Sequence, residues 1–189
     1  LSRERLKAAV DLARPHLAVK LTDFDDDPWM LNVQNGVVDL RTGNLLPHAP
    51  DLLLSRISPT RYDPDAHCSL WEKTLDELME GDSQMVDYIQ RAVGYSLTGK
   101  TSEQVFFFVL GSGANGKSVF LETLKDLLGE YATACRTQTL MAKPGDRVPN
   151  EVARLAGSRL VTVSETNDGQ RLDESLIKEL TGGDTISAR

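Results

Sequence analysis

The spacing of apolar residues divides the first hundred positions into helical and β-rich segments. Apolar side chains recur at helical spacing in residues 3–14 and again, with one interruption, in residues 69–93. Residues 30–58 are instead rich in β-forming residues, and Asn35-Gly36 lies between two short apolar runs. Because Asn-Gly is typical of two-residue hairpin turns, the pattern predicts a β-hairpin that helices precede and follow in the sequence.

The second half of the chain alternates short apolar runs with helical patterns. Residues 105–110 form an uninterrupted apolar run that is typical of a buried parallel strand. Residues 119–128 have helical spacing and stop at Gly129, and residues 159–165 predict another strand. Asp173 is placed to cap a last helix. Strands and helices in this order indicate the α/β fold class with a parallel sheet.

A glycine-rich loop connects the run 105–110 with the helix that follows it. Residues 111–118 fit the pattern G-x-x-x-x-G-K-[ST], in which backbone N–H groups and a helix N-terminus surround nucleotide phosphates. Lys117 is expected to reach the β- and γ-phosphates, and the Ser118 hydroxyl is expected to ligate Mg²⁺. Glycine allows positive φ and close approach to anionic oxygens. The predicted nucleotide-binding residues are Gly111, Ser112, Gly113, Ala114, Asn115, Gly116, Lys117 and Ser118.

A carboxylate stands at the end of the second strand predicted in this half. Glu165 closes the run 159–165, and ligands of open α/β sheets bind beyond the carboxyl ends of the strands. ATP hydrolysis needs Mg²⁺ opposite the phosphates and a water in line for attack, so Glu165 is predicted to polarise that water or hold the metal's hydration shell. The predicted catalytic residues are Lys117 and Glu165, the predicted metal ligands are Ser118 and Glu165, and the predicted cofactors are ATP and Mg²⁺.

Composition and charge exclude several other classes of protein. Hydrophobic residues make up 40% of the 189 positions and charged residues 26%, which is ordinary for a globular protein, and no apolar run is long enough to cross a membrane. Two cysteines, Cys68 and Cys135, do not support a disulfide framework or a four-ligand zinc site, which favours a reducing, cytoplasmic compartment. The net charge of −7 argues against a broad DNA-wrapping surface, but not against DNA contact through a few residues in a channel.

Several motifs together resemble the superfamily 3 helicases, in the branch found as phage, plasmid and poxvirus primase–helicases. The phosphate loop alone is shared by many enzymes, whereas the Thr-Gly-Gly-Asp segment and the upstream Asn-Gly hairpin are more specific. The segments that carry the resemblance are residues 31–40, 62–66 and 94–99 upstream, and residues 111–118, 159–166 and 177–189 in the ATPase part.

The resemblance implies an ATP-driven motor that unwinds DNA as a homo-oligomeric ring, usually a hexamer in the full-length protein. It implies a mixed helical and β-hairpin collar or oligomerisation region in residues 1–100 and a P-loop (RecA/AAA+-like) ATPase core in residues 101–189. In this family, a hairpin after the second acidic motif grips single-stranded DNA, which makes Lys178 and Arg189 the predicted DNA contacts. The alternative for each is a solvent-facing side chain without such a role.

The sequence departs from the family pattern at two points. Ser164 stands where many P-loop motors have Asp before the catalytic Glu. The family's sensor residue and arginine finger would come after Arg189, and the chain starts at Leu1 without a methionine. We therefore expect a piece of a longer polypeptide, with an incomplete ATPase core that turns ATP over poorly by itself. A primase domain upstream of Leu1 stays open, and a phage or plasmid origin would imply the bacterial cytoplasm.

Two other functions remain open at this point. A P-loop phosphotransferase such as a nucleotide kinase shares the loop, but it needs a lid with several arginines, and residues 141–150 contain just Lys143 and Arg147. A non-catalytic assembly module would bind ATP only to set its oligomeric state. Replacing Glu165 with Gln separates the latter from a motor, which should keep ATP binding and lose hydrolysis.

Overall fold

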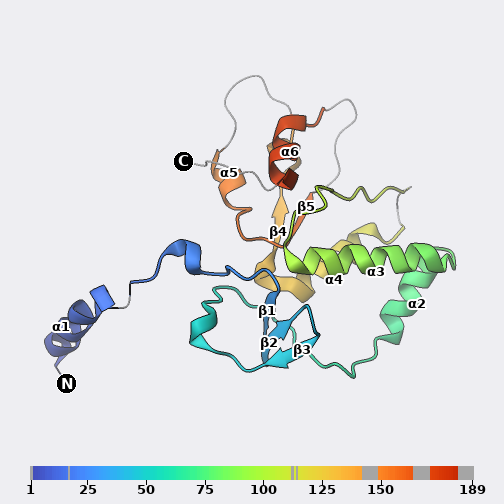
Figure 1. Ribbon diagram of the computed structural model, residues 1–189. Coiled ribbons are helices and arrows are strands. Elements are labelled where there is room, and N and C mark those ends of the chain that lie inside the picture. The colour runs from blue at the N-terminus through green and yellow to red at the C-terminus, as the bar shows by residue number, and fades with distance from the viewer. Residues whose placement is uncertain are drawn as a thin grey trace.

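The structure, a computed structural model, describes residues 2–16, 18–111, 113, 115–141, 149–163 and 171–182 (Figure 1). Helices and two small sheets alternate along the chain. The helices are α1 (Arg3–Ala13), α2 (Ser69–Leu78), α3 (Ser83–Thr98), α4 (Lys117–Leu128), α5 (Pro149–Ala153) and α6 (Glu174–Gly182), and the strands are β1 (Met30–Val33), β2 (Gly36–Asp39), β3 (Asn44–Leu46), β4 (Ala132–Cys135) and β5 (Leu160–Val163).

The strands β1, β2 and β3 form an antiparallel sheet in the order of the sequence. The hairpin predicted around Asn35-Gly36 is confirmed, but Val33 pairs with Gly36, so the turn lies one residue earlier. Gly36 has a φ of 155°, and a Cβ atom there would lie 2.4 Å from the carbonyl oxygen of Leu46. Glycine is therefore required in the strand itself, where β3 comes closest, and not in the turn.

The strands β4 and β5 form a parallel pair in which Cys135 lies opposite Val163. The strand predicted over residues 159–165 is thus confirmed at Leu160–Val163, whereas β4 has no distinctive sequence pattern. This parallel pair and α4 correspond to parts of the predicted α/β core. The complete P-loop core stays a prediction.

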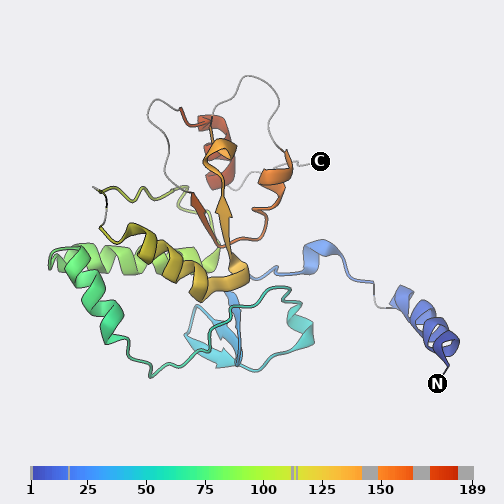
Figure 2. The same cartoon turned by 180° about the vertical axis from the view of Figure 1, so that it is seen from behind.

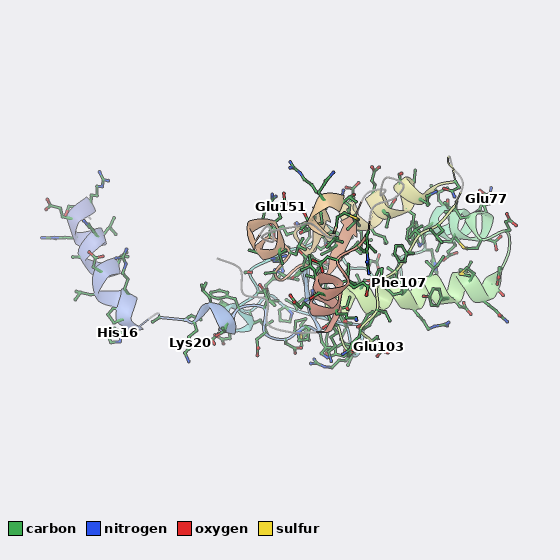
Figure 3. All side chains as sticks on the ribbon, turned by 90° about the horizontal axis from the view of Figure 1, so that it is seen from above. His16, Lys20, Glu77, Glu103, Phe107 and Glu151 are labelled. Carbon is green, nitrogen blue, oxygen red and sulfur yellow. The ribbon has the colours of Figure 1, made fainter. Side chains whose placement is uncertain are left out.

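The strand predicted over residues 105–110 is wrong for the structure described. These residues form no ladder, and Phe108 and Leu110 are 64% and 85% exposed. The Phe107 ring, labelled in Figure 3, instead lies edge-on to the Tyr88 ring of α3, with 6.5 Å between the ring centroids. A strand is stable only when a neighbour satisfies its backbone, and no strand among the described residues pairs with this run.

The main hydrophobic core joins the antiparallel sheet to the far end of α4. In Figure 2 the sheet lies below α4 and the strand β4 rises above it. Because these elements come from both sides of residue 100, one core holds the two halves of the chain together. The buried members of this core are Leu31, Val33, Val38, Leu128 and Tyr131.

The first helix has a different environment from the rest. The Ser2 hydroxyl caps α1 by accepting a hydrogen bond from the Arg5 N–H, yet none of the helix's side chains is buried. Figure 3 shows α1, with His16 just beyond it, away from the other elements. None of the described helices combines the length and apolar character that a membrane span needs.

Candidate functional site

The glycine-rich loop delivers the chain to the N-terminus of α4. Gly116 has φ 76° and ψ −3°, a left-handed conformation that favours glycine, and Lys117 begins the helix directly after it. The first helical hydrogen bond joins the Phe120 N–H to the Gly116 carbonyl oxygen at 2.9 Å. No side chain of the described residues caps this end. The first-turn N–H groups of a 12-residue helix can therefore face an anion.

The ammonium group of Lys117 folds back over the loop that precedes it. Its Nζ donates hydrogen bonds to the Gly111 carbonyl oxygen at 2.8 Å and to the Asn115 Oδ1 at 2.7 Å. Two oxygens of the protein thus hold the positive charge at the mouth of the loop, where phosphate oxygens could take their place. Ser118, the next residue of α4, is exposed.

The glycines of the loop differ in how closely other side chains approach them. A Cβ atom at Gly111 would lie 1.8 Å from the Asn115 Nδ2, and one at Gly116 would lie 2.7 Å from the Leu78 Cδ2. At Gly113, none of the described residues lies within 4 Å of such an atom. Side chains of the protein therefore lie close to Gly111 and Gly116, and the close approach of the loop backbone to anionic oxygens stays a prediction.

The other predicted site residues lie outside the described residues or on a different helix. Ser112, Ala114, Glu165 and Arg189 lie outside the described residues, and β5 ends at Val163, before Glu165. Lys178 is exposed on α6, whose start is capped by the Asp173 carboxylate as predicted. In the described part of the chain, no group of three or more His, Cys, Asp or Glu side chains is arranged to hold a metal ion.

Sequence reasoning missed how the C-terminal end of α4 is closed. The Ser58 hydroxyl donates to the Leu127 carbonyl oxygen at 2.6 Å, and the Thr60 hydroxyl donates to the same oxygen at 3.1 Å. The Glu130 carboxylate accepts a hydrogen bond from the Ile57 N–H at 2.8 Å. The segment 57–60 therefore supplies two donors to the Leu127 carbonyl oxygen at the end of the helix. A serine and a threonine in a loop give no sequence signal for this role.

Tyr131 fixes the helix end to the antiparallel sheet. Its side chain is 1% exposed, and its hydroxyl accepts from the Asn32 N–H at 3.2 Å and donates to the Arg56 carbonyl oxygen at 3.0 Å. Burial raises the pKa of the Tyr131 hydroxyl above its ordinary value. The neutral hydroxyl is therefore the stable form in this site, and it can act as both donor and acceptor.

Arg159 connects β5 to the upstream half of the chain. Its two terminal nitrogens donate to the carbonyl oxygens of Leu97 and Met30, each at 2.6 Å. The guanidinium carbon lies 4.6 Å from the centroid of the Tyr131 ring, a cation–π arrangement. Burial lowers the pKa of Arg159 from its usual range. Arg159 therefore serves as an internal anchor between elements.

Comparison with known proteins adds a relationship for the upstream half. Residues 1–80 match the family described as D5 N terminal like. The matched stretch includes α1, the antiparallel sheet, the segment 57–60 and α2. Of these, the segment 57–60 and α2 contact α4 at its two ends, through Ser58 and Leu78 respectively.

Similar proteins occur in several large viruses. "Putative helicase L207/L206" of Acanthamoeba polyphaga mimivirus is 30% identical over 174 residues, 89% of this chain and 18% of that protein. "Putative helicase 022R" of Frog virus 3 (isolate Goorha) is 32% identical over 105 residues, which are 54% of this chain and 11% of that protein. "Putative primase C962R" of African swine fever virus is 25% identical over 178 residues, which are 88% of this chain and 18% of that protein.

These similarities support a relationship with the viral primase–helicase family. The chain spans about 18% of the length of the mimivirus protein, so it corresponds to one part of such a protein. The proteins described above are viral, and nothing in the comparison bears on the predicted phage or plasmid origin.

Proposed function

We propose that this chain is the nucleotide-binding part of an ATP-dependent DNA helicase motor of the superfamily 3 type, acting in DNA replication. The observation that carries the proposal is the start of α4, where Lys117 lies on a helix end that no described side chain caps and its Nζ is hydrogen-bonded to loop oxygens. The names of the related viral proteins, "Putative helicase" and "Putative primase", favour this function over a nucleotide kinase.

The loop residues fit the phosphates of ATP. The side chains of Asn115 and Leu78 lie close to Gly111 and Gly116, and no described side chain caps the first-turn N–H groups, which supports phosphate binding at this helix end. Lys117 would exchange the Gly111 and Asn115 oxygens for phosphate oxygens. Ser118 and Glu165 would hold Mg²⁺, which neutralises charge on the phosphates, and Glu165 would orient the attacking water.

The DNA-binding part of the proposal concerns the C-terminal segment. Lys178 is exposed on α6, so its ammonium group is available to a phosphate backbone. We propose that Lys178 and Arg189 contact single-stranded DNA in the pore of a homo-hexameric ring. A primase domain in the same polypeptide would lie upstream of the chain and would supply the primers that replication requires.

Binding of MgATP to the 189-residue chain, measured by calorimetry, tests the nucleotide site. Lys117→Ala should weaken binding by about tenfold or more, because a charge-assisted hydrogen bond contributes about 1.5–3 kcal/mol. Lys125→Ala changes a lysine in the last turn of the same helix and should leave the affinity within about twofold. Equal binding by wild type and Lys117→Ala would contradict the proposed site.

Turnover in the longer parent protein tests the motor. Single-stranded DNA should stimulate ATP hydrolysis, and Glu165→Gln should abolish hydrolysis while MgATP binding persists. Stimulation by a small phosphate acceptor instead of DNA would indicate a phosphotransferase. An assembly module would show the same oligomeric state and the same low turnover in wild type and Glu165→Gln.

A further inference from the structure

The helix α2 lies beside the first turn of α4, at the end that carries the phosphate loop. Figures 1 and 2 show α2 on the side of the molecule where α4 begins, and Figure 3 shows Glu77 of α2 on that side. Two contacts join these helices. The rings of Trp71 and Phe120 are stacked with centroids 5.7 Å apart and an angle of 12°. The Leu78 Cδ2 lies 2.7 Å from where a Cβ atom of residue 116 would be.

These contacts act on the two points that set the loop's geometry. Gly116 has the left-handed conformation that turns the chain into α4, and glycine by itself samples many other conformations. Leu78 fills the space next to this backbone, so it restricts the alternatives. Phe120 donates the first helical hydrogen bond to Gly116, and the ring of Trp71 holds that turn from the side.

We propose that Leu78 and Trp71 are positioning residues for nucleotide binding. They act through Gly116 and Phe120. They keep the first-turn N–H groups and Lys117 in the binding conformation before the nucleotide binds. A site that is ordered in advance loses less conformational entropy on binding, so its affinity is higher. This inference rests on the proposed nucleotide site and extends it to a helix within the D5 N terminal like region.

A neighbouring leucine separates positioning from simple packing. Leu75 is 1% exposed and is the buried residue of α2, whereas Leu78 is only partly buried and reaches the loop. Loss of Leu75 side-chain atoms should therefore lower the stability of the chain. Loss of Leu78 side-chain atoms should lower the affinity of the folded chain for nucleotide.

The test measures MgATP affinity by calorimetry well below the urea midpoint of each variant of the 189-residue chain. Leu78→Ala should bind about fivefold to tenfold more weakly, and Leu78→Met, which still reaches Gly116, should recover wild-type affinity within about twofold. Leu75→Val should lower the urea midpoint and leave the affinity within about twofold. Leu70→Ala, at a 76% exposed position of the same helix, should change neither quantity.

The aromatic contact has its own pair of variants. Trp71→Leu should weaken MgATP binding by about threefold to fivefold, whereas Trp71→Phe keeps a ring against Phe120 and should bind within about twofold of wild type. Wild-type affinity in both Leu78→Ala and Trp71→Leu would overturn the positioning role while the nucleotide site stands. Failure of the wild-type chain to bind MgATP would instead remove the nucleotide site, and the positioning role with it.

Discussion

The two ends of α4 differ in how their polar groups are satisfied. At the C-terminal end, two hydroxyl groups donate to the Leu127 carbonyl oxygen, and Leu128 and Tyr131 are 2% and 1% exposed. At the N-terminal end, no described side chain caps the helix, and Val119 is 63% exposed. One end of the helix is therefore fixed by the protein itself. The other end keeps its N–H groups available, which is what an anion-binding site needs.

This difference shows how a small structure can hold a binding loop in place. The buried end sets the direction of α4, since its contacts come from residues that are far apart in the sequence. The lateral contacts of α2 then hold the open end of α4 in position. Substitutions at the closed end should lower stability, and substitutions at the open end should lower binding with little change in stability.

The largest effect should come from Tyr131→Ala, which removes a buried ring and two hydrogen bonds at the closed end. It should lower the free energy of unfolding by about 3–5 kcal/mol, measured by urea unfolding. Val119→Ala at the open end of the same helix should change it by no more than about 0.5 kcal/mol. Comparable losses for the two variants would remove the contrast between the ends.

A smaller loss of stability is expected for Arg159→Met, which keeps the aliphatic part of the side chain and removes both hydrogen-bond donors. The carbonyl oxygens of Leu97 and Met30 would lose their partner, at a cost of about 2–4 kcal/mol in unfolding free energy. Arg159→Lys should recover little of this, because an ammonium group does not reproduce the planar fork. Arg154→Met, at an exposed position, is the control. A wild-type urea midpoint for Arg159→Met would show that the anchor is dispensable.

The smallest of these effects compares one serine at each end. Ser58→Ala leaves the Leu127 carbonyl oxygen with the Thr60 hydroxyl alone and should cost about 1–2 kcal/mol in urea unfolding. Ser118→Ala should change stability by less than about 0.5 kcal/mol, since its side chain is exposed. If Ser118→Ala is the more destabilising of the two, the first turn contributes more to the fold than its exposure indicates.

Elements that depend on local signals could be predicted from the sequence. The hairpin, α4 and the Asp173 cap of α6 each follow from a turn residue, a helical spacing or a capping carboxylate within a few positions. The hairpin register was off by one residue, because the close approach at Gly36 comes from Leu46 of β3, a strand that this turn does not join.

Features that depend on distant partners could not be predicted in the same way. Arg159 donates to the carbonyl oxygen of Met30, 129 positions away, and Ser58 donates to that of Leu127, 69 positions away. Neither residue type by itself predicts such a contact. The apolar run 105–110 shows the converse error, since a good strand sequence forms a strand only with a paired neighbour. At the candidate site, the helix that follows the loop was predictable, but the contribution of α2 was not.

The closure of α4 by residues 57–60 also determines how the chain could be divided. A shortened protein that began at residue 101 would leave Leu128 and Tyr131 facing water and would deprive the Leu127 carbonyl oxygen of both hydroxyl donors. The apolar surface uncovered in that way would favour aggregation over folding. Expression of the downstream half should therefore require the upstream sheet, joined to it or supplied as a separate chain.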